Sequence, residues 1–399
     1  MTALPTILPL AEWTRRADLA ALVDVLDPAG EGVCRWVGGA VRDTLAGVAV
    51  KDFDMATSLL PDVVMARLKA GGIRVVPTGL AHGTVTAVTP GGPVEITTLR
   101  RDVSTDGRHA TVAFSSDWHE DAARRDFTIN AMYADPRTLA ITDFFDGRGD
   151  LVSRRVRFIG DAEARIREDY LRILRYFRFQ ARYGALPADP VAEAACAVLA
   201  PGLKGLSRER VGWELMRLLA HPDPAPTVAR MTELGVLAQI LPEAVDPTAL
   251  PRLIAAELRE GQGPDPLRRL SALLPADPAL AEAVAARLRL SLAQRKRLSL
   301  AAGREGEPGD ARALAYRLGM TEATDRLLLA GASCAPLADW TAPAFPLKGG
   351  AIVARGIKVG PDVARLLRAV EDRWIAEGFP DAARVERLLD AAIAGHQPG

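Results

Sequence analysis

The chain has 399 residues, of which 49% are hydrophobic and 25% charged, and its 50 basic side chains balance its 50 acidic ones. This length predicts two or more domains of an ordinary globular protein. The zero net charge excludes a uniformly basic surface, so any nucleic-acid partner would have to be bound by a local basic face. Three widely separated cysteines, Cys34, Cys196 and Cys334, show no spacing typical of a zinc site or a disulfide framework. They predict a reducing, cytoplasmic setting.

Two apolar stretches were candidates for targeting or membrane insertion. The amino-terminal "MTALPTILPLAEWTRRADL" has no basic residues ahead of its apolar ones and is interrupted by prolines, so we expect no signal peptide. The later "LLLAGASCAPLA", from Leu327, is shorter than the roughly 18 residues of a spanning helix and contains a proline. We therefore predict no membrane segment.

Short β-rich runs alternate with turn signals between about residues 33 and 145. The candidate strands are "VCRWV", "DFDMA", "IRVVP", "HGTVTAV", "VEITTL" and "LAITDFF", and the candidate helix "PDVVMARLKAG" lies among them. This alternation predicts an α/β region.

From about residue 150 onward the pattern predicts helices only. The clearest candidates are "EDYLRILRYFRFQARYG", "DPVAEAACAVLA", "SRERVGWELMRLLA", "PTVARMTELGVLAQIL" and "GPDVARLLRAVEDRWIAEGF". Two Pro/Gly-rich stretches, "EGQGPDPLRR" and "GREGEPGD", predict loops between helical layers, and the second is a candidate joint between subdomains.

Two glycines and an arginine follow the first candidate strand in "VGGAVRD". Gly38 and Gly39 lie directly before a short helical run. A glycine-rich turn into a helix exposes backbone N–H groups that favour anions such as a triphosphate. Arg42 is placed to add a bidentate phosphate contact.

Two aspartates follow in "KDFDMA". On a strand, Asp52 and Asp54 point to the same face, while Phe53 and Met55 point to the other. Paired hard oxygen ligands suit Mg²⁺, and two such ions can serve phosphoryl transfer; Glu95, on a later candidate strand, offers a third carboxylate. Each pattern alone is usually a turn or a solvated strand edge, but their order and closeness favour a nucleotide site. The pair alone does not separate nucleotidyl transfer from other Mg²⁺ chemistry.

The segment "ARRDFTINAMYAD" places Arg124, Arg125 and Asp126 ahead of an apolar run. On a helix, Asn130 would lie one turn beyond Asp126, on the same face, and the two would suit ribose hydroxyls. The alternative is a helix start capped by Asp126, with Asn130 in a turn. On position alone both readings stay open.

The segment "REDYLRILRYFRFQARYG" brings Asp169, Arg172 and Arg175 near one helical stripe. The apolar residues Leu171, Leu174 and Phe177 lie on the packed side. A salt-bridged surface helix is the commonest meaning of such a pattern. A sharper hypothesis comes from base chemistry. Cytosine and adenine offer an amino donor beside an unprotonated ring nitrogen, so a carboxylate at Asp169 and a guanidinium at Arg172 could select C and A over G and U without a template.

These motifs together resemble the family of class II tRNA nucleotidyltransferases and poly(A) polymerases. The match runs in order through "GGAVRD", "DFD", "RRDFTINAM", "EDYLRILR" and "LSRERVGWEL", over roughly residues 33 to 220. The resemblance implies that Asp52 and Asp54 hold the catalytic Mg²⁺ ions and that Arg125, Asp126 and Asn130 form a ribose motif. It also implies that Asp169 and Arg172 act as template for the base, with Arg175 and Arg178 nearby for phosphates. The residues Glu209, Arg210 and Glu214 match a motif thought to steady the neck.

The resemblance also implies an α+β organisation, in which a polymerase-β-like head with a mixed sheet precedes an all-α neck, body and tail. We place the head at 1–145, the base-recognising neck at 146–220, the body at 221–310 and the tRNA-binding tail at 311–399. The helical stretches "RLRLSLAQRKRLSLA" and "LKGGAIVARGIKVGPDVARLL" are candidate tRNA contacts, although ordinary helical surface is at least as good a reading of each.

Within the family, "VVPTGLAHGTVTAV" is similar to CCA-adding members, whereas poly(A) polymerases tend to have a more basic run there. We therefore expect addition of C, C and A to the tRNA 3′ end from CTP and ATP, and nothing in the sequence points to a protein partner. The polar "TLRRDVSTDGRHATVAFSSDWHED" fits the flexible loop such enzymes use when they switch from C to A. The alternatives are a poly(A) polymerase, a C-only or A-only enzyme, and a catalytically silent RNA-binding protein.

Overall fold

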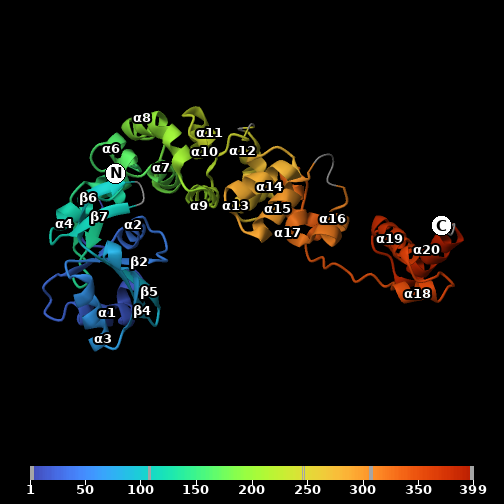
Figure 1. Cartoon of the computed structure of the whole chain (residues 1–399), viewed down its shortest axis with the longest axis horizontal. Coiled ribbons are helices and arrows are strands. Elements are labelled where there is room, and N and C mark those ends of the chain that lie inside the picture. Colours follow the sequence, from blue (N-terminus) through green and yellow to red (C-terminus); the bar gives the residue numbers. More distant parts are fainter. Residues whose placement is uncertain (1–3, 107–108, 245, 247, 305–308, 396–399) are drawn as a thin grey trace. The chain divides into compact units, whose positions relative to one another are not determined.

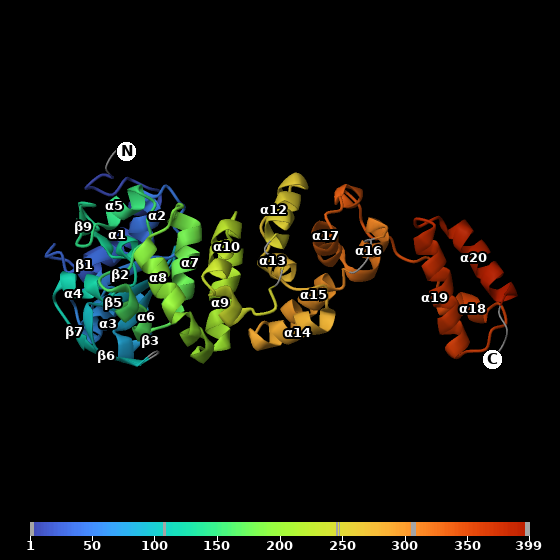
Figure 2. The same ribbon diagram turned by 90° about the horizontal axis from the view of Figure 1, so that it is seen from above.

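The computed structural model describes residues 4–106, 109–244, 246, 248–304 and 309–395. The chain divides into two compact units, Met1–Pro242 and Glu243–Gly399 (Figures 1 and 2). The predicted head and neck both lie in the first unit, the predicted tail lies in the second, and the predicted body spans the division. The division into four parts stays a prediction.

The first unit contains the mixed sheet that the sequence predicts. Its seven strands run in the order β3-β4-β5-β2-β1-β8-β9. Only β2 and β5 pair in parallel among them, and the other neighbours are antiparallel. The strands are β1 (Cys34–Val37), β2 (Phe53–Thr57), β3 (Arg74–Gly79), β4 (Thr84–Thr89), β5 (Gly92–Thr98), β8 (Met132–Ala134) and β9 (Ile141–Asp143). All six candidate strands therefore occur, and β8 is the strand of this sheet that the sequence pattern missed.

Two helices, α1 (Ala17–Leu26) and α3 (Pro61–Ala70), pack against each other and against β4. Leu22 and Leu68 contribute fully buried side chains from these helices. In Figure 1 both helices lie beside β4 and β5, at the blue end of the chain.

The central strand β2 alternates between two environments. Phe53 is buried with its ring 5.4 Å from that of Trp13 and 6.5 Å from that of Trp36. Since side chains alternate along a strand, Asp54 projects from the opposite face. Burial of the aromatic face thus fixes the direction in which Asp54 points.

A hairpin replaces the flexible loop that was predicted between Glu95 and the RRD motif. Strands β6 (Arg100–Asp106) and β7 (His109–Phe114) pair antiparallel, and α4 (Trp118–Ala123) follows. The prediction was wrong because the β-branched residues on both sides of Asp106, such as Val103 and Thr111, favour paired strands. Residues 107–108 lie outside the described part of the chain.

The helix predicted over the RRD motif was also wrong. After Asp126 the backbone forms only a short 3₁₀ turn, η3 (Thr128–Asn130), and then enters β8. Tertiary contacts override the helical pattern here, because the Thr128 hydroxyl donates to the buried Asp150 carboxylate at 2.6 Å. Phe127 is fully buried, with its ring 4.9 Å from that of Phe158.

The rest of the first unit is helical, as predicted. Its helices are α2 (Gly39–Leu45), α5 (Gly147–Val152), α6 (Ala162–Glu168), α7 (Leu171–Tyr183), α8 (Pro190–Leu199), α9 (Arg208–Leu219), α10 (Ala225–Glu233) and α11 (Leu237–Ile240). Helix α7 packs against α9 (Figure 2), and the residues predicted for its packed side, Leu171, Leu174 and Phe177, are buried. One predicted helix is divided into α10 and α11 at Gly235, which has a φ of 70°.

The described residues of the second unit form helices without strands. They are α12 (Ala249–Arg259), α13 (Pro266–Leu273), α14 (Pro278–Arg287), α15 (Leu292–Ala302), α16 (Ala311–Leu318), α17 (Met320–Leu329), α18 (Gly349–Val353), α19 (Pro361–Ala376) and α20 (Ala382–Ala394). The predicted loop "EGQGPDPLRR" lies between α12 and α13, and Asp265 caps α13 by accepting two backbone N–H bonds. The second predicted loop, "GREGEPGD", includes residues 305–308, which lie outside the described part. Across the described ranges, no helix combines the length and apolarity needed to cross a bilayer.

A buried ionic network joins four helices of this unit. Glu257 on α12 accepts hydrogen bonds from Arg268 at 2.8 Å and from Arg269 at 2.8 Å, both on α13. Asp325 on α17 accepts from Arg268 at 3.3 Å and from Arg297 of α15 at 2.7 Å. Glu257, Arg268, Arg269 and Asp325 are each at least 95% buried. The network therefore depends on every charge keeping its partner.

Replacing Glu257 by Gln should lower the free energy of unfolding of the second unit by about 3–5 kcal/mol, because it removes the carboxylate that both Arg268 and Arg269 contact while the two guanidinium groups stay buried. Urea denaturation followed by far-ultraviolet circular dichroism would show this as an earlier transition. Glu282→Gln, which removes the same charge from an exposed position on α14, is the control and should leave the transition unchanged. Equal transitions in both variants would contradict the prediction.

Candidate active site

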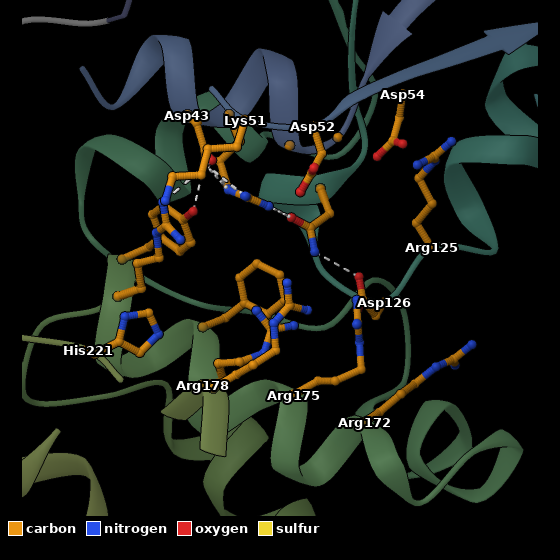
Figure 3. Close-up of a pocket in the computed structure, with 18 of the residues that line it drawn as sticks. Asp43, Lys51, Asp52, Asp54, Arg125, Asp126, Arg172, Arg175, Arg178 and His221 are labelled. Carbon is orange, nitrogen blue, oxygen red and sulfur yellow. Dashed lines mark hydrogen bonds and ion pairs between the residues drawn. The ribbon is translucent and has the colours of Figure 1, made fainter. Parts of the chain in front are cut away.

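A polar cavity of about 790 Å³ lies in the first unit (Figure 3). It is lined by residues from the loops beside β1 and β2, from the RRD segment, and from α7 and α9. The lining consists of Gly38, Gly39, Arg42, Asp43, Ala49, Lys51, Asp52, Asp54, Arg124, Arg125, Asp126, Asn130, Asp169, Arg172, Arg175, Arg178, Phe179, Arg182, Tyr183, Arg217, Ala220 and His221. Every residue predicted to bind nucleotide, and both predicted metal-binding aspartates, are thus brought together.

The two aspartates lie together on one wall. Asp52 directly precedes β2, and Asp54 lies on the strand. Figure 3 shows their carboxylates near each other, across the cavity from Arg172, Arg175 and Arg178. Burial, and then the charges of Glu95 and Asp52, raise the pKa of Asp54 to about 6. The raised pKa means that the ionised form of Asp54 is disfavoured in the absence of a positive charge, which is typical of a site that receives a cation.

The third predicted carboxylate, Glu95, lies in register with Asp54 on the parallel neighbour β5. Its side chain is exposed and does not line the cavity. Within the described ranges, no three His, Cys, Asp or Glu residues are arranged as a set of metal ligands. A divalent ion at Asp52 and Asp54 would therefore complete its shell with oxygen atoms of substrate or water, as Mg²⁺ commonly does.

The glycine turn precedes α2 as predicted. Gly38 has a φ of 64° and a ψ of −116°, a backbone conformation that residues with a Cβ rarely adopt. Arg42, on α2, is 8% exposed and donates from Nε to Asp43 at 2.8 Å. Its guanidinium lies 4.5 Å from the centre of the Tyr183 ring. Packing therefore holds this cation at the cavity wall.

A chain of hydrogen bonds connects the residues predicted for ribose with those predicted for phosphate. Arg42 Nη1 donates to Asn130 Oδ1, and Asn130 Nδ2 donates to Asp126 Oδ1 at 2.9 Å. Arg175 donates from Nε to the other oxygen of Asp126 at 2.8 Å. Burial alone would raise the pKa of Asp126, but Arg175 and Asn130 lower it to about 2. The predicted pairing of Asp126 with Asn130 thus occurs, although no helix produces it.

The predicted base-selecting pair lines the cavity beside the start of α7. Asp169 lies two residues before the helix rather than on its stripe, and Arg172 lies in its first turn. The Arg172 backbone N–H donates to the Asp169 carbonyl at 2.9 Å, whereas the two side chains contact other residues. Asp169 accepts from Arg210 of α9 at 2.6 Å, and Arg172 pairs with Glu168. Each side chain is therefore held by another residue while it lines the cavity.

Helix α9 supports α7 through two residues of the motif predicted to steady the neck. Besides the bond from Arg210 to Asp169, Arg178 Nε donates to the buried Glu214 at 2.6 Å. The prediction missed Asp43, Lys51, Phe179, Arg182, Tyr183, Arg217 and His221 as lining residues. Lys51 adjoins the DFD motif and Arg182 lies four residues after Arg178, so local spacing could have indicated both. Arg217 and His221 reach the cavity only through the packing of α9, for which no local signal exists.

Two protein-family models match parts of the chain. Residues 34–157 match the family model described as "Poly A polymerase head domain". Residues 188–246 match a second model, described as "Probable RNA and SrmB- binding site of polymerase A".

Individual relatives carry a more specific name. The chain is 34% identical to CCA tRNA nucleotidyltransferase 1, mitochondrial, of Mus musculus over 86% of this chain and 83% of that protein. It is 35% identical to the Homo sapiens protein of the same name, over 86% of this chain and 83% of that protein. The CCA-adding enzyme of Geobacillus thermodenitrificans is 40% identical over 50% of this chain and 49% of that protein.

Among solved structures, the Bacillus stearothermophilus CCA-adding enzyme in complex with CTP matches with a TM-score of 0.74 at 26% identity, over 95% of this chain and 98% of that one. A Thermotoga maritima CCA-adding enzyme complexed with tRNA has the same fold, with a TM-score of 0.68 at 20% identity, over 95% of this chain and 98% of that one. The motifs, the mixed sheet with its helical continuation, and the extent of these matches show that the chain belongs to the CCA tRNA nucleotidyltransferase family.

Proposed function

We propose that this protein adds C, C and A to the 3′ end of tRNA, using CTP and ATP and no nucleic-acid template. The observation that carries the proposal is a single cavity in which the Asp52–Asp54 pair faces Arg172, Arg175 and Arg178 (Figure 3), with Asp169 also among the lining residues. The names of the relatives that match over most of their length support the same activity.

The phosphates of the incoming nucleotide would be bound by the turn at Gly38 and Gly39 together with Arg42 and Arg178. Backbone N–H groups at such a turn and a fixed guanidinium both favour anions. Asp126 and Asn130 would orient the ribose, since their hydrogen-bonded pair offers both an acceptor and a donor near the cavity.

Base choice would depend on Asp169 and Arg172. The carboxylate of Asp169 offers only hydrogen-bond acceptors, and Arg210 holds it in place by donating to one of its oxygens. Arg172 can only donate. The two together match the amino group and the unprotonated ring nitrogen of cytosine or adenine, and they oppose the ring N–H of guanine or uracil.

The carboxylates of Asp52 and Asp54 would hold two Mg²⁺ ions. Ions bound there would polarise the α-phosphate, favour ionisation of the attacking 3′-hydroxyl and neutralise the leaving pyrophosphate. The raised pKa of Asp54 and the shared direction of the two carboxylates are the features of this chain that fit such ions. Arg125, held by Asp121 at 3.0 Å, lies beside Asp54 and would limit repulsion between the carboxylates and the phosphates.

The cytoplasmic location remains a prediction. All three cysteines are free and buried, which fits a reducing compartment. The mouse and human relatives carry mitochondrial names.

The function is tested by supplying labelled CTP and ATP, separately and together, with a tRNA transcript that lacks its 3′ CCA. We expect two C's followed by one A. A long A tract would support a poly(A) polymerase, and incorporation of C alone or A alone would identify a partial enzyme. If no nucleotide is incorporated at any Mg²⁺ concentration, the result would support the alternative of a catalytically silent RNA-binding protein.

A further inference from the structure

An exposed tryptophan lies on α9, next to the residues that helix contributes to the cavity. The side chain of Trp213 is 59% exposed. Arg210, three residues earlier, holds Asp169, and Arg217, four residues later, lines the cavity. Residues at these spacings share one stripe of a helix. Trp213 therefore lies on the stripe that faces the nucleotide site, whereas Val211, Leu215 and Leu218 are buried in the core.

Arg217 lies against the indole ring of Trp213, which stays exposed. The guanidinium carbon of Arg217 lies 4.1 Å from the ring centre of Trp213. Within the described ranges, Arg217 forms no ion pair with a carboxylate, unlike Arg210 with Asp169 or Arg178 with Glu214. Trp213 and Arg217 thus present a flat aromatic face beside a cation whose charge is available to a ligand.

The surroundings are positively charged. His221, on the same side of the cavity, has its pKa lowered to about 4 by burial and then by the charges of Arg182, Arg178 and Arg217. An exposed aromatic ring within such a field is typical of sites that bind single-stranded nucleic acid, where bases stack and phosphates pair with cations. Trp213 also lies inside the segment that matches the RNA-binding family model.

We propose that Trp213 is a stacking platform for an unpaired base at the 3′ end of the RNA substrate, and that Arg217 contacts the adjoining phosphate. The proposal rests on the proposed function, which requires an RNA 3′ end to enter this cavity. Trp213 is then a positioning residue, since it orients the strand without touching the reacting atoms. An apolar protein partner fits less well, because arginines border the ring.

The test measures the affinity of Trp213→Ala, Trp213→Phe and Arg217→Gln for a tRNA transcript that lacks CCA, without nucleotide, over a series of salt concentrations. We expect Trp213→Ala to weaken binding about 5- to 100-fold and Trp213→Phe to restore most of it, because stacking tolerates any aromatic ring. The salt dependence should keep its slope in Trp213→Ala, whereas Arg217→Gln should reduce the slope by about one, as expected for one lost phosphate contact.

Two controls separate stacking from a structural effect. Val191→Ala truncates a 67% exposed apolar side chain on α8, outside the cavity, and should bind normally. A transcript trimmed to remove its unpaired 3′ nucleotide should bind wild type and Trp213→Ala equally. In turnover, Trp213→Ala should raise KM for tRNA while KM for CTP and ATP and kcat stay unchanged.

The stacking role of Trp213 and the proposed function can be refuted separately. If wild type extends tRNA but Trp213→Ala binds the untrimmed transcript as tightly as wild type, the platform is refuted and the proposed function stands. If Trp213→Phe binds as weakly as Trp213→Ala, stacking is also refuted. If wild type binds but never extends tRNA, the proposed function is refuted. Weaker binding by Trp213→Ala, with normal binding by Trp213→Phe and Val191→Ala, would still support the platform.

Discussion

Replacing Asp54 by Asn should reduce nucleotide incorporation by roughly three orders of magnitude and at the same time stabilise the metal-free protein at neutral pH. The loss follows because the amide cannot supply the charge that holds a divalent ion against the α-phosphate. The gain follows because Asp54 is half-buried beside Glu95 and Asp52, and its pKa is raised to about 6. Asp52→Ala should lose activity to a similar extent.

The sign of the stability effect depends on pH. The folded-state pKa of Asp54 lies above its usual value of 3.8, so the folded protein retains a proton that the unfolded chain has already released. The contribution of this group to stability therefore falls as pH rises from about 4 to about 6 and stays low above that. Asp54→Asn should raise the melting temperature at neutral pH and lose this advantage near pH 4.

Thermal melts at both pH values, with and without Mg²⁺, check this expectation. Mg²⁺ should stabilise wild type by binding the folded state and should have little effect on Asp54→Asn. Asp62→Asn, which removes an exposed carboxylate on α3, should gain no stability. If wild type and Asp54→Asn respond equally to Mg²⁺, the assignment of Asp54 as a metal ligand is wrong.

Replacing Asp169 by Asn should relax the choice of base. The amide can donate as well as accept, so it no longer opposes the carbonyl oxygen that uracil and guanine carry in place of the amino group. Loss of one such paired contact changes discrimination by about 5- to 150-fold. We expect kcat/KM for CTP and ATP to fall and kcat/KM for UTP to rise. Arg172→Ala should lower discrimination similarly, because Arg172 supplies the donors.

Single-nucleotide incorporation with each of the four triphosphates measures this effect. Glu163→Gln, which removes an exposed carboxylate paired with Arg167 on α6, is the matched control and should keep wild-type selectivity. Arg210→Ala tests the support beneath Asp169, since Arg210 donates to it at 2.6 Å, and it should weaken selectivity less than Asp169→Asn does. Unchanged ratios among the four nucleotides in Asp169→Asn would contradict the template role.

Local sequence patterns were sufficient for most of the elements near the site. The alternation around Phe53 predicted that Asp54 would point to the opposite face of the strand, and burial of Phe53 against Trp13 has that consequence. The glycine pair before α2 and the helix over Leu171–Tyr183 were also predicted, because a turn requiring Gly38 and the apolar stripe of α7 are both properties of neighbouring residues.

The errors occurred where distant contacts compete with local preference. The RRD segment has a helical pattern, yet it forms a 3₁₀ turn and a strand because Thr128 bonds to Asp150 and Phe127 packs on Phe158. The segment predicted as a flexible loop pairs as β6 and β7.

The sequence by itself therefore determined the family, the α+β organisation and the residue types of the site, since motifs, periodicity and turn chemistry are local. Only the tertiary structure decided how those residues are joined. It connects Arg42 through Asn130 and Asp126 to Arg175, and it fixes Asp169 with Arg210. It also brings Arg217 and His221 to the cavity and leaves Trp213 exposed beside it. The physical reason is that hydrogen bonds and packing between segments far apart in sequence depend on the complete fold, and no local spacing contains that information.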